Sequence, residues 1–290
     1  MSTRRARQAN DSAAREGRGR RWAWVCAACL ALGAQAGWGG GEGSEGFRFV
    51  HLSDLHCAPA RRNPPPRFPL DPHRKDLVRS FQKLEAAVRH INAEVRPDFV
   101  VVTGDLVDRR NDVASLRRVK RILSELACPY YPVIGDHDGR AAWRQVFGPE
   151  RLDYAFTYGE WRFLALDVSG GRLRPATLAW LGEQLEAAEG RPTAILVHRP
   201  LVVPEAARLA ARRLYGVALL PANAARALEM LDRRDGVRAV FAGHCHLALR
   251  CERGGVEHHV APALAAPGSP YHVVRVSGSR VRVELRRLAR

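Results

Sequence analysis

Apolar runs alternate with amphipathic stretches over most of the chain beyond residue 46. The run at 98–103 is almost unbroken and that at 47–52 is rich in apolar residues, a pattern typical of strands buried on both faces. Between them, apolar residues from Leu77 to Val95 recur at spacings of four and three, which predicts a helix of about six turns. Pro97 ends this helix.

The alternation continues toward the C-terminus. Helices are predicted over 113–126, 176–188 and 223–231, and strands over 130–134, 194–197 and 238–242. Helices interleaved with apolar strands predict a mainly parallel sheet.

Three segments break this alternation. Residues 154–158 and 161–166 form a predicted hairpin across Gly159-Glu160, and 247–285 contains strands that turn at Gly254-Gly255 and at 277–279. We expect these segments to form a second sheet.

Clusters of Asp, His and Gly each follow a predicted strand. They are Asp54-Leu55-His56, Gly104-Asp105-Leu106-Val107-Asp108-Arg109, Gly135-Asp136-His137-Asp138, His198-Arg199-Pro200 and Gly243-His244-Cys245-His246. An Asp-x-His triplet is expected by chance about 0.5 times in this chain, but Gly-His-x-His only about 0.04 times. Each cluster alone also has a structural interpretation as a turn, a helix cap or a packed His. Their shared position at strand ends, where ligands bind in parallel α/β sheets, favours one common site.

The clusters together offer a mixed set of oxygen and imidazole ligands. Such a set suits zinc, manganese or iron better than calcium. Two divalent cations fit better than one, because the ligands exceed one tetrahedral site and a shared carboxylate can hold both. The candidate ligands are Asp54, His56, Asp105, Asp136, His198, His244 and His246.

The order of these clusters resembles the calcineurin-like metallophosphoesterase family, whose pattern is D-x-H, G-D-x-x-D, G-N-H-D/E, H and G-H-x-H. The resemblance runs from Phe47 to the C-terminus and implies a four-layer α/β/β/α sandwich of two mixed β-sheets flanked by helices. It implies that Asp105 bridges two metal ions. One ion would also be held by Asp54, His56 and His246, and the other by Asp136, His198 and His244.

The resemblance further implies that a metal-bridging hydroxide attacks phosphorus. His137, oriented by the carboxylate of Asp108, would protonate the leaving oxygen, a role that suits a positioned imidazole. Arg109 is a candidate contact to a phosphate oxygen, with a solvated side chain as its alternative.

Two positions depart from the family pattern. Asp136 stands where the family usually has Asn, and this extra carboxylate would hold metals more tightly while reducing the positive charge that attracts phosphate. The stretch 96–105 is similar to the cyclic-nucleotide phosphodiesterase branch, but that branch tends to have His-His-Pro where this chain has His198-Arg199-Pro200. We expect Arg199 to bind substrate and to favour a more highly charged phosphate.

The first 46 residues differ in composition from the rest. A basic stretch ending at Arg21, an apolar run from Trp22 to Leu32 and Ala34-Gln35-Ala36 predict an export signal over 1–36, followed by a Gly-rich linker at 37–46. The apolar run is shorter than the roughly 18 residues of a spanning helix. We therefore expect a periplasmic or extracellular protein whose domain is 47–290, with an uncleaved membrane anchor as the alternative.

Composition narrows the function further. The net charge of +16 is compatible with a nuclease, but an aromatic content of only 7% and the lack of an aromatic-interleaved basic patch disfavour nucleic acid as the partner. Cys57 and Cys245 adjoin candidate ligands, and we expect them to fill space at variable positions, with a disulfide pair or redox-sensitive thiols as the alternative. We expect hydrolysis of a small phosphodiester; the alternatives are a phosphomonoesterase, a nuclease and a non-catalytic metal-binding scaffold.

The substitution Asp136→Asn tests the role of the extra carboxylate. Removing its charge should weaken metal retention while keeping or raising turnover in metal-saturated assays. A large loss of activity at saturating metal would contradict the assigned ligand role.

Overall fold

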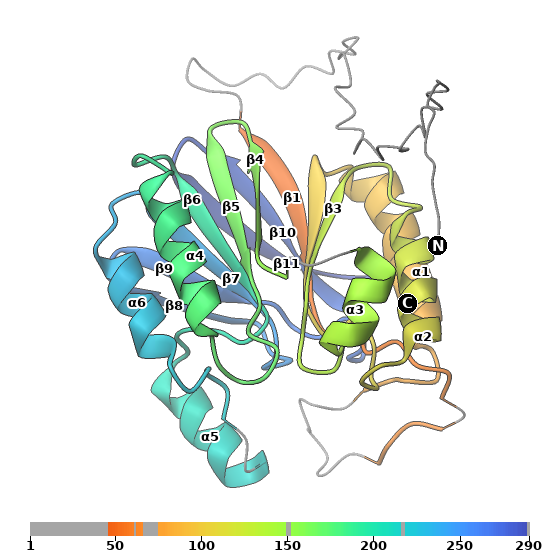
Figure 1. Cartoon of the computed structure of the whole chain (residues 1–290). Helices are drawn as coiled ribbons and strands as arrows, with labels where there is room; N and C mark the ends of the chain where they lie inside the picture. Colours follow the sequence, from red (N-terminus) through yellow and green to blue (C-terminus); the bar gives the residue numbers. More distant parts are fainter. Residues whose placement is uncertain (1–45, 61, 66–74, 149–151, 216–217, 289–290) are drawn as a thin grey trace, which may run out of the picture. The chain divides into compact units, whose positions relative to one another are not determined.

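The computed structural model describes residues 46–290 except 61, 66–74, 149–151, 216–217 and 289–290 (Figure 1). The predicted export signal and all of the predicted linker but Gly46 lie outside the described residues, as does much of the Pro-rich loop at 58–73. None of the described helices is both long enough and apolar enough to cross a membrane.

Two mixed β-sheets form the centre of the fold. The first has the order β11-β10-β1-β2-β3. In it β1, β2 and β3 are parallel to one another, and β10 is antiparallel to both of its neighbours, β1 and β11. The second has the order β4-β5-β6-β7-β9-β8, in which β5, β6, β7 and β9 are parallel and both edge strands antiparallel. The strands are β1 (Phe47–Leu52), β2 (Phe99–Thr103), β3 (Tyr130–Val133), β4 (Tyr154–Tyr158), β5 (Trp161–Leu166), β6 (Thr193–Val197), β7 (Val237–Ala242), β8 (Leu249–Arg253), β9 (Val256–Val260), β10 (Pro270–Ser277) and β11 (Arg280–Arg287).

This division corrects the expected grouping of strands. The parallel strands do not form one sheet, and the hairpin and C-terminal strands do not form another. Instead each sheet has a parallel centre, which β10 and β11 extend in the first sheet and β4, β8 and β9 extend in the second. The predicted four-layer sandwich of two mixed sheets is confirmed.

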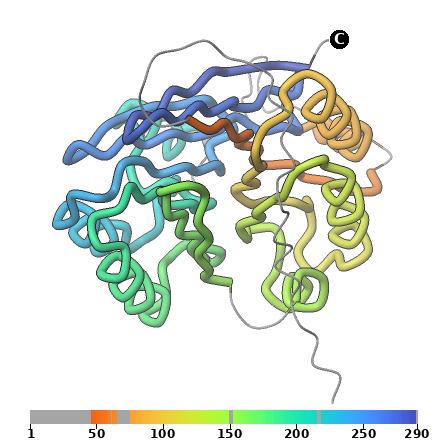
Figure 2. The backbone as a smooth tube through the Cα atoms, turned by 90° about the horizontal axis from the view of Figure 1, so that it is seen from above, coloured from red at the N-terminus to blue at the C-terminus, as the bar shows by residue number. Residues whose placement is uncertain are grey.

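Helices cover the outer faces of both sheets (Figures 1 and 2). α1, α2 and α3 lie on the side of the first sheet, and α4 and α6 on the side of the second. The predicted helix at 77–95 is an α-helix followed by one π-helical turn, and α3 and α5 were not predicted. The helices are α1 (Ser80–His90), η1 (Ile91–Val95), α2 (Val113–Leu123), α3 (Arg140–Phe147), α4 (Pro175–Glu186), α5 (Glu205–Tyr215) and α6 (Ala224–Asp232).

Aromatic rings fill the space between the two sheets. Phe49 of β1 and Phe99 of β2 stack at a centroid distance of 4.9 Å. Phe163 of β5 meets both rings edge-on, at 5.9 Å and 5.2 Å. All three side chains are fully buried. This core fixes one sheet against the other and so sets how the loops at their ends face each other.

Phe163→Ala should therefore destabilise the protein by about 3–5 kcal/mol, because the lost ring leaves a cavity between the sheets. Urea unfolding followed by circular dichroism measures the change. Leu209→Ala is the control, since this residue of α5 is 47% exposed and its loss should change stability by no more than about 0.5 kcal/mol. A loss below about 1 kcal/mol for Phe163→Ala would contradict a tightly packed inter-sheet core.

Candidate metal centre

All seven predicted ligands lie in loops that follow strands, and these loops come from both sheets. Those after β1, β2 and β3 carry Asp54, His56, Asp105 and Asp136, and those after β6 and β7 carry His198, His244 and His246. Parallel strands place their carboxyl ends at one edge, so the two edges together form the site.

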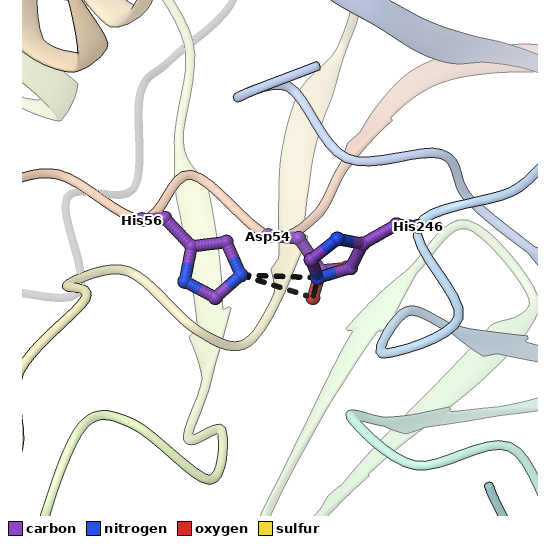
Figure 3. A group of neighbouring side chains, drawn as sticks. All are labelled: Asp54, His56 and His246. Carbon is purple, nitrogen blue, oxygen red and sulfur yellow. Dashed lines mark hydrogen bonds and ion pairs between the residues drawn. The ribbon is translucent and has the colours of Figure 1, made fainter. Parts of the chain in front are cut away.

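The first group of side chains converges tightly (Figure 3). Nε2 of His56 and Nε2 of His246 lie 3.1 Å apart, and Oδ1 of Asp54 lies 3.3 Å from Nε2 of His246. Oδ2 of Asp105 lies 3.7 Å from Nε2 of His56. All four residues are buried. Two imidazole nitrogens and the Asp54 carboxylate converge, and the Asp105 carboxylate lies beside them. Zinc, manganese and iron accept such a mixed donor set.

The second group shares Asp105 with the first. Oδ2 of Asp105 lies 3.3 Å from Nε2 of His198, and Nδ1 of His244 lies 3.4 Å from Oδ2 of Asp136. The structure thus brings together both sets implied by the family resemblance, with one oxygen of Asp105 between them.

Several ligand atoms have the unsatisfied character expected of a cation site. Within the described residues, Oδ1 of Asp54, Oδ1 of Asp136 and Nε2 of His198 are buried without a hydrogen-bond partner. Buried polar atoms seldom stay unsatisfied without a reason. A pair of divalent cations therefore fits the residues present.

Two of the ligand imidazoles differ in their surroundings. Nδ1 of His198 donates to the carbonyl of Thr103 at 2.8 Å, which directs Nε2 toward Asp105. Burial opposes a charge on His198, but the nearby carboxylates, Asp105 first among them, together outweigh burial and raise the pKa of this imidazole to about 10. A cation bound at Nε2 would therefore have to displace a proton. Burial and then the charge of Lys75 lower the pKa of His56 to about 3.

The backbone at the ligands adopts an unusual conformation. Five of the seven have positive φ, between 44° and 68°: Asp54, His56, Asp105, His244 and His246. A side chain in this left-handed region costs about 1–2 kcal/mol relative to ordinary conformations, although Asp and His tolerate it better than most. Strain of this kind persists where the surrounding fold enforces it, typically at functional sites.

Two motif glycines allow the loops to approach each other. A Cβ on Gly135 would collide with the backbone and carboxylate of Asp105, and one on Gly243 would collide with Ser53 and the carboxylate of Asp54. Any larger residue at either position would push a ligand out of place.

The relation of Asp108 to His137 differs from the prediction. Nδ1 of His137 donates to the main-chain carbonyl of Asp108 at 2.6 Å, so the carboxylate of Asp108 does not orient this ring. The carboxylate instead accepts from Lys75 Nζ at 2.9 Å and lies 3.3 Å from Nδ1 of His56. Burial opposes its charge, but these two neighbours hold the pKa of Asp108 below its usual range. Asp108 therefore supports a ligand.

Sequence reasoning gave no role to Lys75 or Asp138. Lys75 follows the Pro-rich loop, and only its rarity among the many arginines sets it apart in the sequence. Asp138 stands inside the Gly135–Asp138 cluster, and its buried carboxylate accepts from the backbone N–H groups of Val107 and Gly135 at 3.1 Å and 2.8 Å. Burial and then the charge of Asp105 raise its pKa to about 7. Asp138 thus ties the loop after β2 to the loop after β3.

The predicted substrate contacts have different surroundings. Arg199 donates from Nε to Oδ2 of Asp136 at 2.8 Å, so it reaches the site. Arg109 is exposed, whereas the adjacent Arg110 donates from Nε to the main-chain carbonyl of Asp136 at 2.9 Å. The substrate role of Arg109 stays a prediction.

The cysteines beside the ligands do not form a redox pair in this structure. Cys57 and Cys245 are both free and buried, and burial raises the pKa of both thiols. Buried thiols of high pKa react poorly, which supports the expectation that they fill space.

Several phosphodiesterases are similar in sequence to this chain. A probable cyclic nucleotide phosphodiesterase of Synechococcus is 29% identical over 58% of this chain and 66% of that protein. A cAMP/cGMP dual specificity phosphodiesterase of Mycobacterium tuberculosis is 26% identical over 75% of this chain and 67% of that protein. A glycerophosphodiester phosphodiesterase of Enterobacter lignolyticus is 28% identical over 52% and 56%. The chain spans about two thirds of the first two relatives and just over half of the third.

The fold is also found in solved structures. A dimetal phosphatase from Danio rerio superposes with a TM-score of 0.65 at 17% identity, covering 84% of this chain and 96% of that one. The sequence pattern of the calcineurin-like phosphoesterases matches residues 47–248, a range that includes all seven candidate ligands. This match covers most of the chain, and the protein therefore belongs to the calcineurin-like phosphoesterase family.

Proposed function

We propose that this protein hydrolyses a small phosphodiester with the help of two divalent cations, Mn, Fe or Zn. The observation that carries the proposal is the position of Asp105, whose single oxygen Oδ2 faces both ligand groups. A shared carboxylate holds two cations close enough together to contact one phosphate.

When bound, the cations would activate water near neutral pH and neutralise the charge that develops on the phosphate. The first would be held by Asp54, His56, Asp105 and His246. The second would be held by Asp105, Asp136, His198 and His244.

We expect His137 to act on the leaving group. Its side chain is 40% exposed, and its Nε2 lies 4.0 Å from Oδ2 of Asp105. A carbonyl can only accept, so the bond to Asp108 O fixes a proton on Nδ1 and leaves Nε2 to exchange one with substrate. His137 would donate that proton to the departing oxygen.

A polar pocket begins two residues after His137 in the sequence, at Gly139, and is also lined by Arg110, Asn111, Arg140 and Ser169-Gly170. We infer that this pocket would accept a polar leaving group. Three relatives are named phosphodiesterases, of cyclic nucleotides or of glycerophosphodiesters, which supports a diester over a monoester.

Purified protein loaded with Mn²⁺ or Zn²⁺ should hydrolyse bis-(p-nitrophenyl) phosphate and cyclic nucleotides faster than p-nitrophenyl phosphate, and DNA least. Asp105→Asn should lose both bound metal and activity, because one residue serves both cations. Metal analysis and product release give the two measurements. Bound metal without turnover on any of these substrates would instead favour a scaffold.

His137→Ala should lower kcat by about a hundred- to ten-thousandfold without changing the metal content. The loss should be smaller with p-nitrophenol as leaving group than with an alkyl alcohol, because a weaker base needs less protonation. Kinetics on the two kinds of diester measure this difference. An equal loss on both would argue against an acid role.

A further inference from the structure

The carboxylate of Asp136 faces two kinds of partner. Its Oδ2 lies 3.4 Å from Nδ1 of His244 and 4.0 Å from Nε2 of His198, which places it in the second ligand group. The same Oδ2 accepts the Nε–H of Arg199 at 2.8 Å, while Oδ1 is buried without a hydrogen-bond partner among the described residues. A cation at this group would therefore share Asp136 with a guanidinium.

Contacts on several sides hold the guanidinium of Arg199. Nη1 donates to the carbonyl of Ala218 at 2.8 Å, and the guanidinium passes near Gly171, where an added Cβ would be 3.7 Å from Cζ. Ala222 N donates to Gly171 O at 2.8 Å, which links these two segments to each other. The side chains of Asp136 and Arg199 are only 15% and 19% exposed. The pair is fixed and largely shielded from water.

We propose that Asp136 and Arg199 act as one unit, an inference that rests on the proposed function. The Asp136 carboxylate would bind both the second cation and Arg199. Its contact with Arg199 would hold the guanidinium beside the cations as a fixed positive donor for the phosphate. Arg199 is thus a positioning and specificity-determining residue.

Electrostatics explains what the unit provides. An unpaired carboxylate at this position would bind the cation more tightly but would reduce the positive charge available to a phosphate. Arg199 cancels that charge, so the site attracts an anion as strongly as it would with a neutral amide at position 136. Guanidinium has five N–H donors, and the contacts to Asp136 and Ala218 use two of them, which leaves donors for phosphate oxygens.

The first test is a double-mutant cycle on metal affinity. Mn²⁺ is titrated calorimetrically into the metal-free full chain and into Asp136→Asn, Arg199→Gln and the double variant. Arg199→Gln should bind Mn²⁺ more tightly, because Asp136 is released to the cation. Asp136→Asn should weaken binding about tenfold in the wild-type background and about a hundredfold in the Arg199→Gln background. Equal effects within about twofold in both backgrounds would overturn the unit.

Two controls separate this pair from general charge. Arg172→Gln removes a positive charge next to Gly171 from an exposed side chain, and its cycle with Asp136→Asn should be additive. Arg199→Lys keeps the charge without the planar fork, so Mn²⁺ affinity should stay near the wild-type value.

The second test uses inorganic phosphate as the probe. Binding of phosphate to the Mn²⁺-loaded protein should weaken about tenfold in Arg199→Gln and by less in Arg199→Lys, because charge is retained only in the latter. An unchanged phosphate affinity in Arg199→Gln would overturn the phosphate-facing role.

Both tests remain decisive if the proposed function fails. A metal-loaded wild-type protein that hydrolyses no phosphate ester would contradict that function, while the coupling of Mn²⁺ affinities would still be measurable. Conversely, turnover together with an additive cycle would contradict the unit alone.

Discussion

The carboxylate of Asp105 occupies the point on which the rest of the site depends. It belongs to the loop after β2 in the first sheet, yet one of its oxygens faces His198 in the second sheet as well as His56 in its own. The distance of 3.3 Å between Asp105 and His198 joins side chains of different sheets, so it tolerates little sliding of one sheet against the other. The aromatic core between the sheets therefore contributes to the chemistry, because it sets the separation over which Asp105 must reach.

Close loop packing provides the remaining precision. Five of the seven ligands have a left-handed backbone, and Gly135 and Gly243 let neighbouring loops lie almost in contact. Asp138 then joins two of these loops through backbone N–H groups. Ligands held on a rigid frame in this way need little rearrangement to accept a cation.

Most of the ligand set was predictable from the sequence because strand ends and residue types agree in five clusters. The grouping of strands was not, since a buried parallel strand has the same apolar pattern in either sheet. Contacts between residues distant in sequence were also inaccessible. Lys75 belongs to no motif, so its contact with Asp108 could not be predicted. The sequence also cannot tell whether His137 binds the carbonyl or the carboxylate of Asp108, and the three-dimensional structure shows that it binds the carbonyl. Asp136 and Arg199 are two unrelated departures from the family pattern in the sequence, but they form one ion pair in the structure.

The distribution of the ligands along the chain has a consequence for biosynthesis. His56 and His246 contact each other across 190 positions, and both ligand groups include residues from the loop after β7. A ribosome must therefore complete nearly the whole domain before either cation can find its full set of donors. No amino-terminal fragment ending before this loop retains a complete site, so the centre is a property of the finished fold.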